Sequence, residues 1–231
     1  MTITLYDSRV SPNARKVRLL AAELDIPLTR VALDPQKSEF RSPEYLAKNP
    51  NGKVPMIEDD GFVLWESAAI LKYLAANQPG RGLVPSSLKE QAQVDQWLFW
   101  WTAHPESALS RLTYERRIKP FLGQPGNDAS IVAEAEAALD RFLPILDAQL
   151  AGKENILGKL SVVDFAVGPW LEIAPTFLEV DLVDYPNLIT WLKRLRRSLT
   201  GKKRRLGPEI EQAADWCAPG GASCFARGSA T

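Results

Sequence analysis

The sequence predicts an α/β domain followed by an all-helical domain. Strand and helix patterns alternate in the early part of the chain, and strand patterns nearly vanish after it. The breaker-rich run Gln78-Pro79-Gly80-Arg81-Gly82 lies between the two regimes. We therefore expect an α/β domain at 1–79, a linker at 80–88, a helical domain at 89–200 and a basic, Gly-rich tail at 201–231.

The first half of the α/β domain has the pattern of a strand, a helix and a second strand. Residues 2–6 alternate apolar and polar side chains, which is typical of a strand. Ser11 and Pro12 form an N-cap followed by proline at the first helical position, and apolar residues recur at helical spacing over 12–24. A second strand is predicted at 29–33.

The second half of this domain has the pattern of a helix, a hairpin and a helix. A second Ser-Pro pair predicts a short helix at about 43–48. Asp60-Gly61 lies between two apolar stretches, which is the strongest short signal for a hairpin, and a helix follows over roughly 67–77. The resulting order, β-α-β-α-β-β-α, is that of a thioredoxin-like domain.

The second domain is predicted to be all-helical. Ser161 and Asp164 have the spacing of a capping box, which marks the start of one helix. The helical patterns cover 87–118, 129–151, 162–177 and 186–199.

Composition argues against several classes of partner. The formal net charge is zero, and the basic run at 194–205 lacks the interleaved aromatics of a nucleic-acid site, so we expect a solvated surface there. The N-terminus has no signal-peptide pattern, and no apolar run reaches membrane-spanning length. The two cysteines, Cys217 and Cys224, lie near the C-terminal end, so we expect no disulfide framework in the folded body. His104 has no metal-ligand cluster around it, and we expect an ordinary helix residue there. We expect a cytoplasmic protein with no metal, membrane or nucleic-acid partner.

Four motifs resemble those of the cytosolic glutathione transferases, in the order and spacing of that family. They are Leu5-Tyr6, Ser11-Pro12-Asn13-Ala14-Arg15-Lys16-Val17, Asn49-Pro50-Asn51-Gly52-Lys53-Val54-Pro55 and Glu66-Ser67-Ala68-Ala69-Ile70. The resemblance covers about residues 1–200 and extends to the capping box, which is similar to the family's N-capping motif. It is closest to the serine-type branches (phi, theta and bacterial relatives), and the Ser-Pro-Asn run also resembles the bacterial nu class.

The resemblance implies a set of residues that bind glutathione as co-substrate: Arg41, Lys53, Val54, Pro55, Glu66 and Ser67. A cis Val-Pro bond would leave the valine backbone to pair with the cysteinyl part of glutathione. The serine would hold the γ-glutamyl carboxylate at a helix N-terminus, the glutamate would take the amine, and the two cations would meet the glycine carboxylate. The alternatives are a trans-proline, a simple helix cap and solvated surface charges.

The same resemblance assigns the chemistry to Ser11. Its hydroxyl would donate to the glutathione sulfur and stabilise the thiolate, with the Asn13 amide as a second donor. Tyr6 is a third candidate, because some branches use a tyrosine near this strand end. The alternative for Ser11 is a purely structural N-cap.

An acceptor pocket is expected between the first domain and the helices after residue 87. Its candidate residues are Trp97, Trp101, Arg111 and Tyr114, although core or dimer-interface packing is the alternative for each tryptophan. The resemblance also implies a homodimer, with contacts from the helix at 67–77 and the helix after residue 87.

Three functions remain open at this point. The first is transfer of glutathione to a small hydrophobic electrophile. The second is a glutathione-dependent disulfide or peroxide reductase, which the Ser-Pro-Asn run keeps open. The third is a non-catalytic interaction module, which the intact Ser11 and Glu66-Ser67 disfavour.

Overall fold

The computed structural model describes residues 3–34, 37–125 and 127–203. The α/β part contains β1 (Ile3–Asp7), α1 (Pro12–Glu23), β2 (Leu28–Ala32), α2 (Pro43–Lys48), β3 (Met56–Asp59), β4 (Phe62–Trp65) and α3 (Ser67–Ala76). The helical part contains α4 (Leu88–Ala103), α5 (Pro105–Thr113), a π-helical turn (Tyr114–Ile118), α6 (Lys119–Phe121), α7 (Ala129–Leu150), α8 (Val162–Phe177) and α9 (Pro186–Lys203).

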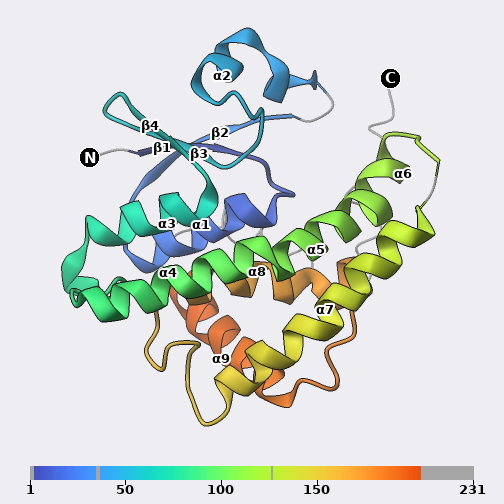
Figure 1. The fold of residues 1–231 in the computed structure, drawn as a ribbon. Helices are drawn as coiled ribbons and strands as arrows, with labels where there is room; N and C mark the ends of the chain where they lie inside the picture. Colours follow the sequence, from blue (N-terminus) through green and yellow to red (C-terminus); the bar gives the residue numbers. More distant parts are fainter. Residues whose placement is uncertain (1–2, 35–36, 126, 204–231) are drawn as a thin grey trace.

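The four strands form one mixed sheet in the order β2-β1-β3-β4. β1 runs parallel to β2 and antiparallel to β3, and β3 and β4 form the predicted hairpin around Asp60-Gly61. Ile3, Leu5 and Ile57 bury their side chains in the same core as α1 and α3, which lie between the sheet and the helical part (Figure 1). The thioredoxin-like order predicted from the sequence is confirmed.

α8 is the central helix of the helical part, in contact with α1, α3, α4, α5 and α9 (Figure 1). The predicted capping box starts it: the Ser161 backbone N–H donates to Asp164 Oδ2 over 2.9 Å. Asp164 also accepts bonds from the Ile156 N–H over 3.1 Å and the Trp191 indole over 3.0 Å. Burial raises the pKa of Asp164, and these hydrogen bonds offset part of that rise. The donors therefore stabilise the ionised form of a buried carboxyl group.

The helix predicted over 87–118 is wrong as a single element, because the chain breaks at His104. This residue has φ −116° and ψ −82°, which separates α4 from α5. Pro105 explains the break, since proline offers no N–H and disfavours helical geometry in the residue before it. The His104 ring stacks on Phe142 of α7 at 4.7 Å between centroids, so this histidine marks a junction between helices.

The last helix is longer than predicted. α9 continues to Lys203, beyond the expected end at 199. Most of the predicted tail, 204–231 with both cysteines, lies outside the described residues, and the domain boundaries remain predictions. Within the described ranges, no helix is both long and apolar enough to cross a membrane.

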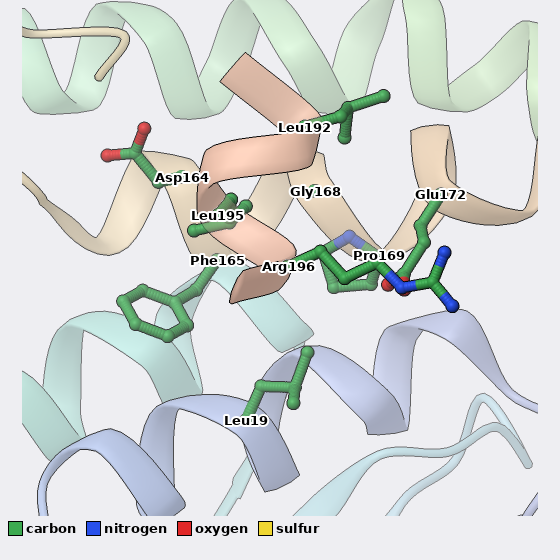
Figure 2. Close-up of a pocket in the computed structure, with 9 residues that line it drawn as sticks. All are labelled: Leu19, Asp164, Phe165, Gly168, Pro169, Glu172, Leu192, Leu195 and Arg196. Carbon is green, nitrogen blue, oxygen red and sulfur yellow. The ribbon is translucent and has the colours of Figure 1, made fainter. Parts of the chain in front are cut away.

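α8 and α9 approach each other most closely at a glycine. A Cβ added at Gly168 would lie 2.5 Å from Leu195 Cδ2, much closer than a van der Waals contact allows. A small cavity of about 20 Å³ adjoins this contact. Figure 2 shows its lining, with Gly168 on α8, Leu195 on α9 in front of α8, and Leu19 on α1. A side chain at this position would therefore require the buried Leu195 side chain or the two helices to shift.

We expect Gly168→Ala to lower the free energy of unfolding by about 1–3 kcal/mol, the usual range for an overpacked core. Gly80→Ala is the matched control, because a Cβ at Gly80 meets nothing within 4 Å. That control should stay within about 0.5 kcal/mol of wild type. Urea unfolding measures both variants, and equal losses would contradict the close-approach argument.

Candidate functional site

A cavity of about 400 Å³ opens between the α/β part and the helical part. The start of α1, the segment before β3, α5 with its π-helical turn, α6 and α8 all contribute to its wall. Polar side chains come from both parts: Ser11, Asn13 and Lys53 from the α/β part, and Ser110, Thr113 and Arg117 from the helical part. The apolar lining includes Val10, Phe40, Ile118, Phe121, Leu122 and Phe177.

Ser11 is both the N-cap of α1 and part of the cavity wall. Its Oγ accepts a bond from the Ala14 N–H over 3.2 Å, and Pro12 occupies the first helical position as predicted. Accepting this bond leaves the hydroxyl hydrogen available for donation. The partial positive charge of the α1 N-terminus acts at the same place, so an anion in this part of the cavity is stabilised.

Asn13 stands beside Ser11 and is held by a residue from the other domain. The indole N–H of Trp170, on α8, donates to Asn13 Oδ1 over 2.9 Å. Both residues line the cavity. The amide of Asn13 therefore has a defined orientation at the cavity wall.

The segment before β3 forms another part of the cavity wall. The Val54-Pro55 bond is cis, as the sequence predicted, and Lys53 and Val54 line the cavity. Two donors hold the Lys53 carbonyl: the Tyr45 hydroxyl over 2.6 Å and the Asn49 amide over 2.7 Å. This segment is therefore fixed by α2 and the turn after it.

Glu66 and Ser67 lie at the junction of β4 and α3. Glu66 has φ 74°, an uncommon backbone conformation for a residue with a side chain, and is exposed. The β3–β4 register, which pairs Met56 with Trp65, brings Glu66 beside Pro55. Neither Glu66 nor Ser67 lines the cavity itself, and the Ser67 hydroxyl accepts a hydrogen bond from Lys16 Nζ over 3.4 Å.

Arg41 is exposed at the end of a short helical turn, Glu39–Arg41. Phe40 of this turn lines the cavity, but Arg41 does not. The turn packs on Gly52, where an added Cβ would lie 2.8 Å from the Phe40 carbonyl oxygen and where φ is +57°. Glycine at 52 therefore permits the close approach that brings Phe40 to the cavity.

A buried ion pair connects α1 to α5 behind the site. Lys16 Nζ lies 2.8 Å from Glu106 Oε2 and 3.4 Å from Ser67 Oγ, and both charged residues are almost fully buried. Burial lowers the pKa of Lys16, while Glu106 raises it. One ammonium group thus joins three helices: α1, α3 and α5.

Comparison with known proteins gives the same family from sequence and structure. The N-terminal domain of glutathione S-transferase matches residues 5–82, and the C-terminal domain matches residues 129–194. Glutathione S-transferase F10 of Arabidopsis thaliana is 33% identical over 175 residues, which cover 74% of this chain and 80% of that protein. GstB of Escherichia coli K12 is 30% identical, covering 84% of this chain and 92% of its own.

The chain belongs to the glutathione S-transferase family.

A solved structure agrees with this assignment. A glutathione transferase family member from Pseudomonas fluorescens, with two glutathione molecules bound, superposes with a TM-score of 0.75 at 26% identity. The match covers 85% of this chain and 92% of the other. The family resemblance and the fold predicted from the sequence are both confirmed.

Tyr6 of this transferase does not line the cavity. Its hydroxyl donates to Glu58 Oε2 over 3.3 Å and accepts from Lys48 Nζ over 3.0 Å. Lys48 and Glu58 also form an ion pair of 2.6 Å, which is the main cause that raises the pKa of Lys48 and lowers that of Glu58, and the Tyr6 hydroxyl adds to both effects. The three groups form a polar network of their own. The hydroxyl is therefore committed to a surface network away from Ser11.

The residues expected in the acceptor pocket do not line this cavity either. Trp101 has no exposed surface and Trp97 packs partly buried against the core. Arg111 forms an ion pair with Glu134 at 3.7 Å, and Tyr114 is 42% exposed. The four side chains serve packing and surface contacts in this structure.

The face of α5 that lines the cavity is not the face that carries the predicted pocket residues. In the structure, the face of α5 and its π-helical turn that meets the cavity carries Ser110, Thr113 and Arg117. Arg111 and Tyr114 lie one residue further round the helix, on the neighbouring face.

Sequence reasoning missed the contribution of α8 to the cavity. Trp170, Ile173 and Phe177 all line it, but in the sequence they belong to an ordinary apolar helix pattern. The sequence shows that their spacing places them on one face of a helix, but it does not show which part of the molecule that face contacts. Metal-ligand side chains do not gather in groups of three within the described ranges.

We expect Glu106→Gln to lower the free energy of unfolding by about 3–5 kcal/mol at neutral pH, because it leaves a buried ammonium without its countercharge. The exposed pair Lys72–Asp95, with a similar distance of 2.6 Å, supplies the control. Asp95→Asn should cost no more than about 1 kcal/mol.

The pH dependence of Glu106→Gln gives a second readout. Without Glu106 the pKa of Lys16 falls further in the folded state, while the unfolded state keeps a value near 10.4, an approximate reference. The unfolded state then binds more protons, so the stability of the variant rises from neutral pH toward that value. Urea unfolding at several pH values measures this, and a gap from wild type that widens with pH would contradict it.

Proposed function

We propose that this glutathione S-transferase stabilises the thiolate of bound glutathione at the start of α1. The thiolate then attacks a hydrophobic electrophile held against the apolar lining of the same cavity. The observation that carries the proposal is the placement of Ser11 and Asn13 in one cavity with an apolar wall.

The thiolate is the form of glutathione that reacts. A free cysteine thiol has a pKa of about 8.5, and hydrogen-bond donors and a helix N-terminus lower it. The Ser11 hydroxyl and the Asn13 amide nitrogen supply donors beside the positive end of α1. Each donor favours the charged sulfur over the neutral thiol, so a larger fraction of bound glutathione is reactive at neutral pH.

The rest of glutathione would extend from the sulfur along the polar groups of the α/β part. The Val54 backbone would pair with the cysteinyl backbone, with Pro55 shaping that edge. The γ-glutamyl carboxylate would meet Ser67 at the α3 N-terminus, and its amine would meet Glu66. Lys53 would bind the glycine carboxylate, with the exposed Arg41 as a second cation.

The electrophile would bind against the apolar wall opposite the sulfur. Burial of its apolar surface there supplies binding energy and places its reactive carbon next to the thiolate. The sulfur electron pair forms a new S–C bond. In a substitution the bond to the leaving group breaks with its electron pair; in an addition the electrons move onto the acceptor, which takes a proton from water.

A homodimer in the cytoplasm is part of the same proposal. Phe62 of β4 and Phe99 of α4 are 50% and 73% exposed, and Leu88 at the start of α4 is 82% exposed. Exposed apolar side chains on β4 and α4 fit an interface that includes α4, one of the two helices that the sequence analysis named. Sedimentation of the full chain would measure the oligomeric state.

Reduction of glutathione disulfides is the second candidate. It is supported by the related Pseudomonas fluorescens protein, whose structure holds two glutathione molecules. In that reaction the bound thiolate attacks a mixed disulfide, forms glutathione disulfide and releases the other thiol. Assays with a nitro-activated aryl chloride and with a glutathione mixed disulfide, run side by side, separate the two activities.

We expect Ser11→Ala to raise the thiol pKa of bound glutathione by roughly 1–2, since a hydrogen bond to a charged group contributes about 1.5–3 kcal/mol. Ultraviolet absorbance of the thiolate as a function of pH measures this value. Conjugation of the aryl chloride should fall in parallel at neutral pH.

Ser42→Ala is a matched control. Ser42 also precedes a proline and caps its helix with the same 3.2 Å bond, here from the Tyr45 N–H, but it does not line the cavity. Both variants lose a cap, worth about 1 kcal/mol of stability, and only Ser11→Ala should change the thiol pKa. An unchanged pKa in Ser11→Ala, or no saturable glutathione binding by wild type, would overturn the proposal.

A further inference from the structure

We propose that Trp170 is a positioning residue for the thiolate, acting through Asn13. Its indole holds the Asn13 amide in the one orientation that turns the NH2 group toward the cavity. The inference rests on the proposed function, because it concerns the site where the glutathione sulfur would lie.

The chemistry of the indole fixes the orientation of the amide. A tryptophan Nε1–H is a donor only, whereas an asparagine side chain offers an acceptor oxygen at one end and two donor hydrogens at the other. The contact of 2.9 Å between Trp170 Nε1 and Asn13 must therefore involve the amide oxygen. A flipped amide would place two donors against each other and lose the bond.

The amide nitrogen remains available for a ligand. Among the described residues, none accepts a hydrogen bond from Asn13 Nδ2, and Asn13 lines the cavity next to Ser11. In this orientation the amide presents hydrogen atoms to a sulfur anion. In the flipped orientation it would present oxygen lone pairs, which repel the anion.

Trp170 itself is well fixed. It is 3% exposed and lies on α8, the most deeply buried helix of the helical part. Two residues further on, Glu172 pairs with Arg15 of α1 at 2.6 Å. The donor and acceptor therefore sit on two helices that are tied together independently of this hydrogen bond.

The test is the thiol pKa of bound glutathione in Trp170→Phe, measured from thiolate absorbance. The variant keeps an aromatic ring but removes the N–H, so the Asn13 amide is released. We expect the pKa to rise by about 1 or more, comparable to the rise in Asn13→Ala. In the Asn13→Ala background, Trp170→Phe should cause no further rise, because the two residues act as one unit.

Trp191→Phe is the matched control. Trp191 is also buried, and its indole N–H also donates to a side-chain oxygen, that of Asp164 at 3.0 Å, but it does not line the cavity. A general loosening of the helical part would affect both variants. Only Trp170→Phe should change the thiol pKa.

A second pair of variants keeps the test decisive if Trp170→Phe does not fold. Benzothienylalanine at position 170 has the shape of tryptophan without the N–H and should raise the pKa in the same way. Asn13→Asp can still accept from Trp170, but it turns a second acceptor oxygen toward the sulfur. It should raise the pKa more than Asn13→Ala does.

The outcomes separate this inference from the proposed function. If wild type lowers the thiol pKa and Ser11→Ala raises it, while removal of the Trp170 N–H leaves it unchanged, the positioning role is wrong and the proposed function stands. An equal rise in Trp191→Phe, or a full further rise from Trp170→Phe in the Asn13→Ala background, would also overturn the role. If wild type does not lower the thiol pKa at all, the proposed function fails first.

Discussion

The first turns of α1 are fixed by side chains from the helical domain, and the rest of the site depends on that constraint. Asn13 bonds to Trp170 at 2.9 Å, Arg15 pairs with Glu172 at 2.6 Å, and Lys16 pairs with Glu106 at 2.8 Å. Buried charges are tolerated only with partners, so these contacts specify one relative placement of the two domains. The start of α1, which would face the glutathione sulfur, is therefore held in place by the contacts between the two domains.

The opposite edge of the cavity is fixed by a separate set of contacts. Tyr45 and Asn49 hold the Lys53 carbonyl, and Gly52 permits the turn at Phe40 to approach closely. These contacts lie within the α/β part and do not involve the helical domain. The segment at Lys53 is thus positioned by contacts within the α/β part, whereas the start of α1 is positioned by contacts with the helical domain.

This difference explains how much the sequence could predict. Ser11-Pro12, Asp60-Gly61 and the Ser161 capping box were visible in the sequence, because caps and turns depend on a few neighbouring residues. The cis Val54-Pro55 bond was expected from the family resemblance instead. Trp170 could not be placed next to Asn13 from the sequence, since 157 positions separate them and only packing brings them together. The predicted pocket residues also differ from the cavity lining, because the sequence does not show which face of α5 meets the α/β part.

One face of α8 carries residues with two different tasks. Trp170, Ile173 and Phe177 follow each other at helical spacing and all line the cavity. On the proposed function, the first of them orients a donor to the thiolate, and the other two form part of the wall for the electrophile. A shift of α8 would therefore move Trp170, which orients the Asn13 donor on α1, together with part of the acceptor wall. The packing of α8 against α1, α3, α4, α5 and α9, including its close approach to Leu195 at Gly168, resists such a shift.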